Sequence, residues 1–141
     1  MLACYKECAE YGAKYGVKLG IQNHGDMLRT AEQCKYILDR LDRKWAGLIL
    51  DTGNFKTIDP YKDIAEMVPY AINWQVKESV FEIGSPIKTD YNKLMKIVVE
   101  GGYNGYLPVE TLLARGQPYD PFNQVPAMLK EMQAALKKAR K

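Results

Sequence analysis

Four polar residues close four apolar stretches of the chain, at intervals of roughly 24 to 35 residues that suit a repeated strand-and-helix unit. They are Gln22, Asp51, Gln75 and Glu110. Two are carboxylates and two are amides, a set of hard oxygen atoms of the kind that divalent cations accept. The polar turn after a buried parallel strand is also where ligands usually bind. This spacing therefore predicts a ligand site built from four strand ends.

Each polar residue must be positioned by the strand that precedes it. These strands are short and largely apolar, which is typical of a buried parallel sheet. Because side chains alternate along a strand, all four polar residues can face one side, and Gly20 and Gly47 leave room there. In the third strand, we expect Ile72 to share the opposite face with Trp74 and Val76. The four strands are expected at residues 17–23, 46–51, 71–77 and 105–110.

Helices separate the strands, and their ends carry recognisable signals. Thr30 and Gln33 have capping-box spacing, and Asp59 and Asp90 can each cap a following helix. A loop is expected through residues 84–86. The expected helices are residues 2–15, a helix from Thr30, a short one from Pro60 that ends before Pro69, one from Asp90 to Gly101, and a C-terminal helix. The apolar stripe expected on that last helix is Phe122, Val125, Leu129, Met132 and Leu136.

A helix followed by four strand–helix units predicts an α/β fold with four parallel strands and right-handed crossovers. In a (β/α)8 barrel, the face shared by the four polar residues would be the inward face, and their edge would be the catalytic edge. Such a barrel needs roughly 200 residues or more. The 141 residues therefore predict a single half-barrel domain, residues 1–141, that lacks the other βα units.

Composition narrows the class of protein. The formal charge of +3 comes from interspersed Lys and Glu, so it gives no reason to expect nucleic acid binding. No apolar run is long enough to span a membrane. The three cysteines form neither a CxxC pair nor an even framework, which favours reduced thiols in a cytoplasmic protein.

Several short motifs together resemble the sugar phosphate isomerase/epimerase family, within the xylose isomerase-like TIM barrel superfamily that also contains endonuclease IV-type nucleases. The resemblance spans nearly the whole chain and implies the C-terminal half of a TIM barrel, its last four βα units. The motifs are Ile21-Gln-Asn-His-Gly25, Leu50-Asp-Thr-Gly-Asn-Phe55, Asp59-Pro-Tyr61, Pro69-Tyr70, Gln75-Val-Lys77, Gly102-Tyr-Asn-Gly-Tyr106 and Glu110.

The resemblance implies a metal site at Gln22, Asp51, Gln75 and Glu110, for Mn²⁺ or Mg²⁺, with Zn²⁺ as a further candidate. Gln22 stands where the family usually has glutamate, and Gln75 where many members have histidine. An amide can coordinate a cation through oxygen, but it brings no charge and accepts no proton at neutral pH. Metal binding is therefore expected to be weak or absent.

The resemblance also implies roles in proton transfer beside a carbonyl group, on a sugar or sugar phosphate. Glu110, Lys77 and Gln22 are the candidates for the catalytic step. The candidates for substrate contact are His24, Asn54 and Arg115.

Each candidate also has a plainer interpretation as a turn residue, a solvated side chain or a backbone hydrogen-bond partner. The alternatives for the whole chain are a non-catalytic fragment or carbohydrate-binding module, and a lyase, dehydratase or metal hydrolase on the same scaffold. Four strands with helices on one side leave the inward face bare. We expect a homo-oligomer, or the missing N-terminal half-barrel, to cover it.

Overall fold

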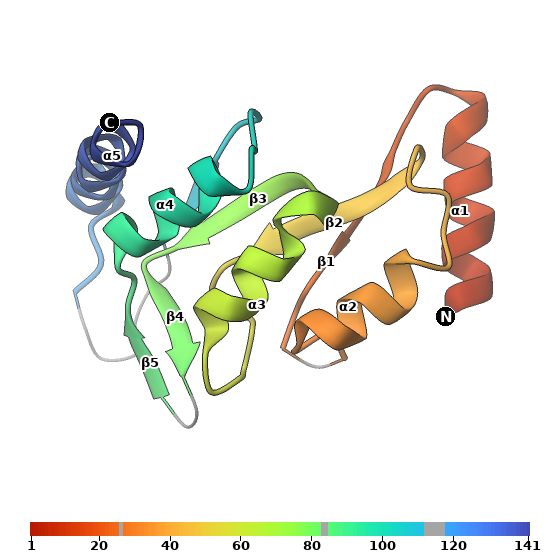
Figure 1. Ribbon diagram of the computed structural model, residues 1–141, viewed down its shortest axis with the longest axis horizontal. Helices are drawn as coiled ribbons and strands as arrows, with labels where there is room; N and C mark the ends of the chain where they lie inside the picture. The colour runs from red at the N-terminus through yellow and green to blue at the C-terminus, as the bar shows by residue number, and fades with distance from the viewer. Residues whose placement is uncertain (26, 83–84, 112–117) are drawn as a thin grey trace.

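A computed structural model describes residues 1–25, 27–82, 85–111 and 118–141. Its centre is a four-stranded parallel sheet in the order β1-β2-β3-β6, and a separate hairpin is formed by β4 and β5 (Figure 1). The elements are α1 (Leu2–Lys14), β1 (Leu19–Gln22), α2 (Ala31–Leu38), β2 (Ala46–Asp51), α3 (Pro60–Met67), the 3-10 turn η1 (Val68–Tyr70), β3 (Ala71–Lys77), β4 (Ser79–Glu82), β5 (Ser85–Lys88), α4 (Tyr91–Glu100), β6 (Val109–Glu110) and α5 (Pro121–Ala139).

The helices begin where the capping residues predict. The side chain of Thr30 accepts a hydrogen bond from the backbone N–H of Gln33, and Asp59 caps α3 with Pro60 at its first position. Asp90 accepts from the backbone of Asn92 and Lys93 at the start of α4. These bonds satisfy N–H groups that have no partner inside a helix, so the boundaries are set locally.

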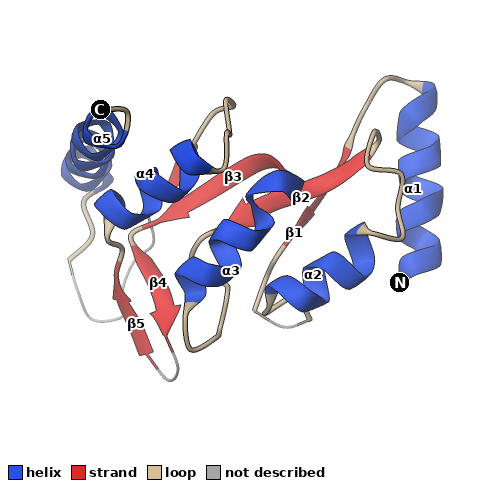
Figure 2. Ribbon diagram, in the orientation of Figure 1, coloured by secondary structure: helices blue, strands red, loops and turns tan. Residues whose placement is uncertain are grey.

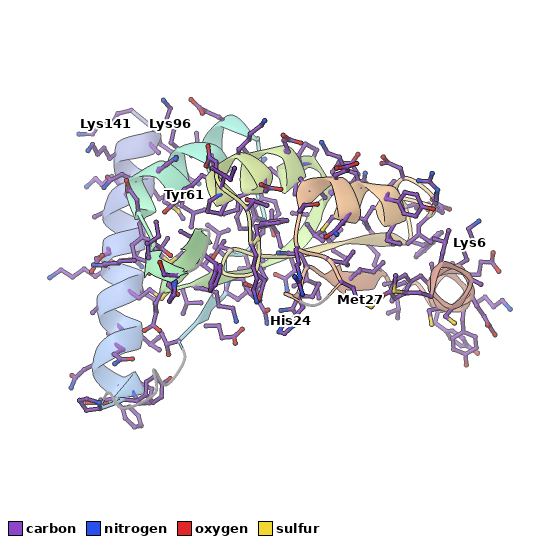
Figure 3. All side chains as sticks on the ribbon, turned by 90° about the horizontal axis from the view of Figure 1, so that it is seen from below. Lys6, His24, Met27, Tyr61, Lys96 and Lys141 are labelled. Carbon is purple, nitrogen blue, oxygen red and sulfur yellow. The ribbon has the colours of Figure 1, made fainter. Side chains whose placement is uncertain are left out.

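Helices α2, α3 and α4 cover one side of the sheet, which we call the outer face (Figures 2 and 3). Leu48, Leu50, Trp74 and Val76 point into this layer and are completely buried. Helix residues such as Cys34, Ile64 and Leu94 complete the same core. The prediction of an α/β fragment with four parallel strands, consistent with part of a TIM barrel, is confirmed.

The opposite side of the sheet, the inner face, differs from the sequence expectation at Ile72. Leu48 pairs with Ala71 and Ile49 with Asn73, so Ile72 is an extra residue in β3 and the alternation of side chains along β3 breaks at it. A Cβ atom on Gly47 would meet the side chain of Ile72, and one on Gly20 would meet Ile49. Ile72 therefore covers the inner glycines rather than joining Trp74, and the expected face of this residue was wrong.

The last strand is shorter than the expected 105–110. Only Val109 and Glu110 pair with β3, although the N–H of Val76 also donates to the carbonyl of Pro108 at 2.8 Å. A proline cannot return a backbone hydrogen bond, and among the described residues β3 is the one strand that pairs with β6. The regular ladder therefore begins after Pro108.

The expected loop after the third strand contains a hairpin instead. Strands β4 and β5 are antiparallel, with Val80 opposite Ile87 and Phe81 opposite Pro86. Val80 is completely buried in the core, and Ile87 packs against it. The two strands are short and flank residues 83–84, and the sequence offered no clear alternation to predict them.

The apolar stripe of α5 agrees with the predicted one in part: Met132 is buried and Leu136 packs against the core, as expected. Met128, Met132 and Ala135 are buried where α5 packs on α4, whereas Phe122 is 88% exposed and Leu129 is 39% exposed. The errors lie at Phe122 and Leu129, because an apolar stripe does not say which of its residues will meet a neighbour. None of the described helices is both long enough and apolar enough to cross a lipid bilayer.

Candidate functional site

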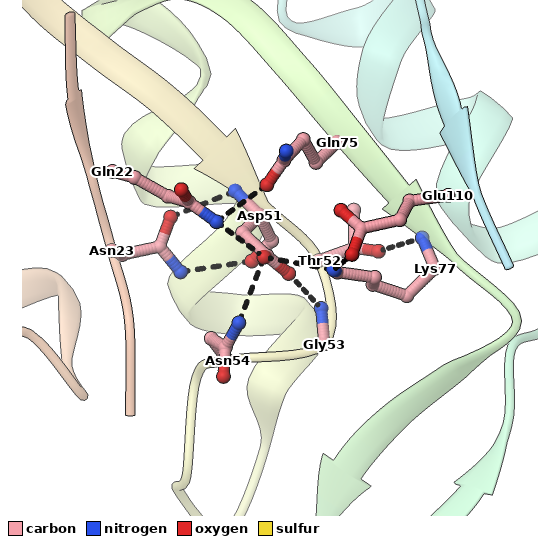
Figure 4. A network of polar contacts seen from close by, with 9 residues as sticks. All are labelled: Gln22, Asn23, Asp51, Thr52, Gly53, Asn54, Gln75, Lys77 and Glu110. Atoms are coloured by element: carbon pink, nitrogen blue, oxygen red, sulfur yellow. Dashed lines mark hydrogen bonds and ion pairs between the residues drawn. The ribbon is translucent and has the colours of Figure 1, made fainter. Parts of the chain in front are cut away.

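The strand-end residues meet at the carboxyl edge of the sheet (Figure 4). Asp51 at the end of β2 lies opposite Gln75 in β3, and Lys77 at the end of β3 lies opposite Glu110 in β6. Gln22 ends β1 beside Ile49. Parallel strands bring their carboxyl ends to one edge, so residues about thirty positions apart become neighbours.

Asp51 lies at the centre of the site and is completely buried. Its Oδ1 atom accepts a hydrogen bond from the backbone N–H of Gly53 at 2.9 Å. Its Oδ2 atom accepts from Gln22 Nε2 at 2.8 Å and from Asn54 Nδ2 at 2.7 Å. These donors satisfy a charge that would otherwise be costly to bury.

Two buried residues that the sequence analysis did not single out hold this edge together. The side chain of Asn23 accepts from the backbone N–H of Asp51 and donates to its carbonyl, each at 2.8 Å. Thr52 Oγ1 accepts from the backbone N–H of Lys77 at 2.9 Å. Both side chains act as substitutes for strand pairing beyond the ends of β1 and β2. The sequence does contain a signal for this role, because Asn23 and Thr52 directly follow the predicted site residues Gln22 and Asp51.

Lys77 places an ammonium group between two carboxylates. Its Nζ atom lies 2.6 Å from Glu110 Oε1 and 3.4 Å from Asp51 Oδ2. The Lys77 side chain is only 10% exposed, whereas that of Glu110 is 34% exposed. Gln22 Nε2 donates to Gln75 Oε1 as well as to Asp51, which ties the two amides into the same network.

A pocket of about 310 Å³ opens over this network. His24 is exposed at its rim and lies on the side of the sheet away from α2 and α3 (Figure 3). Arg115, the third predicted substrate contact, lies outside the described residues. The pocket is lined by His24, Gly53, Asn54, Lys77, Glu78, Ser79 and Glu110.

A larger hollow of about 570 Å³ lies between α1 and β1. Its lining is mostly apolar and includes Tyr11, Val17 and Leu19. The smaller pocket is the better candidate for chemistry, because it brings a carboxylate and an ammonium group to one partly shielded space.

The donor set of the site does not fit a divalent cation well. Asp51 already accepts three hydrogen bonds, and the amide N–H groups of Gln22 are directed at the oxygens of Asp51 and Gln75. Lys77 holds a positive charge against both carboxylates. Among the residues that the structure describes, no three His, Cys, Asp or Glu side chains come together as metal ligands.

The fold and its polar strand ends define a class of protein, the barrels that carry their sites at the carboxyl ends of parallel strands. The sequence profile described as xylose isomerase-like TIM barrel matches residues 1–139. The chain belongs to this family. No curated protein matches the chain in sequence.

Solved structures show the same fold at low sequence identity. The xylose isomerase domain protein from Planctomyces limnophilus superposes with a TM-score of 0.76 at 16% identity, over 99% of this chain and 54% of that one. An L-ribulose 3-epimerase gives a TM-score of 0.75 at 19% identity, with the same coverage. The D-psicose 3-epimerase from Clostridium cellulolyticum H10, solved with D-tagatose, gives 0.65 at 18% identity, over 99% of this chain and 54% of that one. The chain therefore spans about half the length of the solved structures that it matches.

Proposed function

We propose that the chain carries the catalytic edge of a sugar isomerase or epimerase, which moves a proton at a carbon beside a carbonyl group. The observation that carries this proposal is the contact between Glu110 and Lys77 at the mouth of the pocket, 2.6 Å apart. A carboxylate can act as the base, and a nearby cation can stabilise the negative charge that develops on the substrate oxygen. The names of the structural neighbours support a small sugar as the substrate class.

Glu110 is the proposed acid/base, because it is the more exposed of the two carboxylates and lines the pocket. Lys77 is the proposed electrostatic group, and Gln22 orients the buried Asp51 through its amide. Asn54 and His24 line or approach the same space and can meet substrate hydroxyl groups. Arg115 remains a proposed contact for a phosphate group, and Gln75 a neutral member of the network.

Exchange of substrate hydrogen for deuterium tests this proposal. A panel of ketoses and their phosphates would be incubated in D₂O with the chain and followed by proton NMR. A fusion of the chain to the first four βα units of a family member would be run in parallel, because the chain covers about half of its structural neighbours. We expect exchange at the carbon beside the carbonyl, lost in Glu110→Gln.

The matched control is Glu131→Gln, which removes a glutamate that pairs with Lys88 on the surface at 3.1 Å. This variant should exchange hydrogen as the unmodified chain does. Absence of exchange on every sugar, in both the chain and the fusion, would contradict the proposal.

A non-catalytic carbohydrate-binding role is the second candidate. Its support is the three hydrogen bonds that the Asp51 carboxylate already accepts, together with the amides at positions 22 and 75. Saturable sugar binding without any deuterium exchange would favour this role. A lyase or dehydratase would instead release water from the same substrates. A metal hydrolase of the endonuclease type has less support, because the chain contains a single histidine.

A further inference from the structure

We propose that the ammonium group of Lys77 takes the place of a divalent cation at this site, so that its carboxylates are organised around a cation that the chain itself supplies. The chemical role given to Lys77 rests on the proposed function. The prediction about metal binding stands independently of it.

The position of Lys77 in the sheet supports this proposal. β3 lies between β2 and β6, and its last residue, Lys77, pairs with Glu110 of β6. Asp51 of β2 pairs with Gln75, two residues earlier, and the Lys77 side chain reaches back to it at 3.4 Å. The backbone of Lys77 is held at both ends of the residue: its N–H donates to Thr52 Oγ1 at 2.9 Å, and its carbonyl accepts from Thr89 Oγ1 at 2.8 Å. The ammonium group is thus fixed between the carboxylates by buried contacts (Figure 4).

The charges of the site favour an internal cation over an added one. Asp51 and Glu110 contribute two negative charges, and Lys77 neutralises one of them. A divalent ion between these carboxylates would lie within a few ångströms of the ammonium group, in a partly buried space where charges repel strongly. It would have to displace Lys77 to bind well.

The hydrogen bonds of Asp51 oppose a metal in a second way. Gly53, Gln22 and Asn54 all donate to its two oxygens. Gln22 could offer an oxygen to a metal only by rotating its amide, which would bring that oxygen against the oxygens of Asp51 and Gln75. A cation must therefore compete with several N–H donors as well as with Lys77.

In the proposed reaction, Lys77 would do what a polarising cation does. The C–H bond beside the carbonyl breaks, its proton moves to Glu110, and the electron pair shifts to the carbonyl oxygen as an enediolate. Lys77 stabilises that oxygen through its ammonium group. Glu110 then returns the proton to the former carbonyl carbon, while the hydroxyl proton of the other carbon moves to the former carbonyl oxygen. The carbonyl group thus changes place and no oxidant or reductant is needed. Return of the proton to the original carbon gives exchange with solvent only. This chemistry requires a sugar in its open-chain carbonyl form.

Titration with Mn²⁺, followed by the electron paramagnetic resonance signal of the free ion, tests the proposal directly. The unmodified chain should not saturate below about 1 mM Mn²⁺. Lys77→Met removes the ammonium group at similar length, and it should tighten Mn²⁺ binding about tenfold or more. Adding Gln22→Glu to Lys77→Met should tighten it further. Lys93→Met is the matched control, because it removes a lysine that lies 3.8 Å from Asp59 on the surface. It should leave Mn²⁺ binding unchanged.

Micromolar Mn²⁺ affinity in the unmodified chain would overturn the proposal, as would a folded Lys77→Met variant that binds no better. Circular dichroism establishes whether that variant folds. If it does not, the unmodified chain still decides the question by NMR. About 100 μM Mn²⁺ should leave the signals of the Gly53 N–H and the Gln22 side-chain amide unbroadened. Selective broadening of both signals would overturn the proposal.

The exchange assay separates this inference from the proposed function. Deuterium exchange that survives EDTA and is lost in Lys77→Met supports an internal cation. Exchange that EDTA abolishes overturns it while leaving the isomerase proposal intact. Absence of exchange on every sugar removes the chemical role of Lys77 but leaves the metal-binding result to stand on its own.

Discussion

The two faces of the parallel sheet are covered in different ways. On the outer face, Leu48, Leu50 and Trp74 are completely buried beneath helices. On the inner face, Ile49 and Ile72 are only partly buried, and they fill the space above two glycines of the sheet itself. Helices thus supply the cover on one side, and the strands supply a thin cover of their own on the other.

The outer face therefore contributes most of the packing that stabilises the molecule, and the inner face is the one available for function. A parallel sheet normally has both faces covered, and here the polar strand ends share a side with the thinly covered face. The matched structures are about twice as long as the chain, which is consistent with a second body over the inner face. We expect that body to be a second copy or a complementary half-barrel.

The largest expected effect comes from truncating neighbouring residues on the two faces of β2. Leu50→Ala should lower the free energy of unfolding by about 2–5 kcal/mol, because it opens a cavity in the packed outer layer. Ile49→Ala should cost about 1 kcal/mol, because that side chain is partly exposed. Urea unfolding followed by circular dichroism measures both. Equal losses would show that the inner face is packed as tightly as the outer one.

A methyl group added to the inner face should have the next largest effect. Gly47→Ala places a Cβ atom against Ile72, and the resulting overpacking should cost about 1–3 kcal/mol. Ile72→Ala in the same chain should relieve most of that cost. A double-mutant cycle from urea unfolding measures the coupling. Strictly additive losses would mean that Ile72 does not lie over Gly47.

The third prediction compares Cys34, which is buried in α2, with Cys4 and Cys8, which are exposed on α1, at alkaline pH. Burial raises the pKa of the Cys34 thiol from 9.0 to about 12, with a smaller contribution from Asp63. The native state therefore keeps a proton that the unfolded chain releases. The stabilisation is full below pH 9 and is lost as the pH rises from 9 towards 12, by up to about 1.4 kcal/mol per pH unit.

Urea midpoints at pH 8, 9 and 10 should therefore fall less steeply in Cys34→Ala than in the unmodified chain. At pH 8, iodoacetamide should modify the exposed Cys4 and Cys8 but spare Cys34, as read by mass spectrometry. Modification of native Cys34 at the rate of the other two would contradict its burial.

The smallest effect on stability is expected at Asn73, which is exposed and two residues before Gln75 on the inner side of β3. Asn73→Lys should change the free energy of unfolding by less than about 0.5 kcal/mol. It should nevertheless weaken any association through the inner face, as measured by sedimentation at low micromolar concentration. Asn92→Lys, on α4 of the outer layer, is the matched control. Identical monomers for all three chains would mean that a second copy is not what covers the inner face.

Local signals in the sequence predicted much of the fold because they act over a few residues. The caps Thr30, Asp59 and Asp90 mark helix starts that the structure confirms. The strands at 46–51 and 71–77 match β2 and β3 in full. Apolar runs and capping residues are sufficient here because a cap bonds backbone groups only two or three residues away, and a buried parallel strand is itself a short apolar run.

The errors share a different cause. Ile72 changed faces because of a register shift, and Phe122 was assigned to the buried stripe of α5 although it is exposed. The hairpin of β4 and β5 has Val80 in the core but too few residues to show a period. Each of these features depends on which neighbour an element meets, and a pattern within one segment does not contain that information.

The site shows the same difference between what local sequence predicts and what depends on neighbouring elements. The sequence by itself determined that two carboxylates, two amides and a lysine would stand at strand ends with compatible alternation, because alternation and parallel order follow from the chain. Only the tertiary structure decided that Lys77 lies between Asp51 and Glu110, and that Gln22 directs its N–H groups at Asp51. Those contacts depend on distances of about 3 Å between side chains on different strands, which packing and backbone register set.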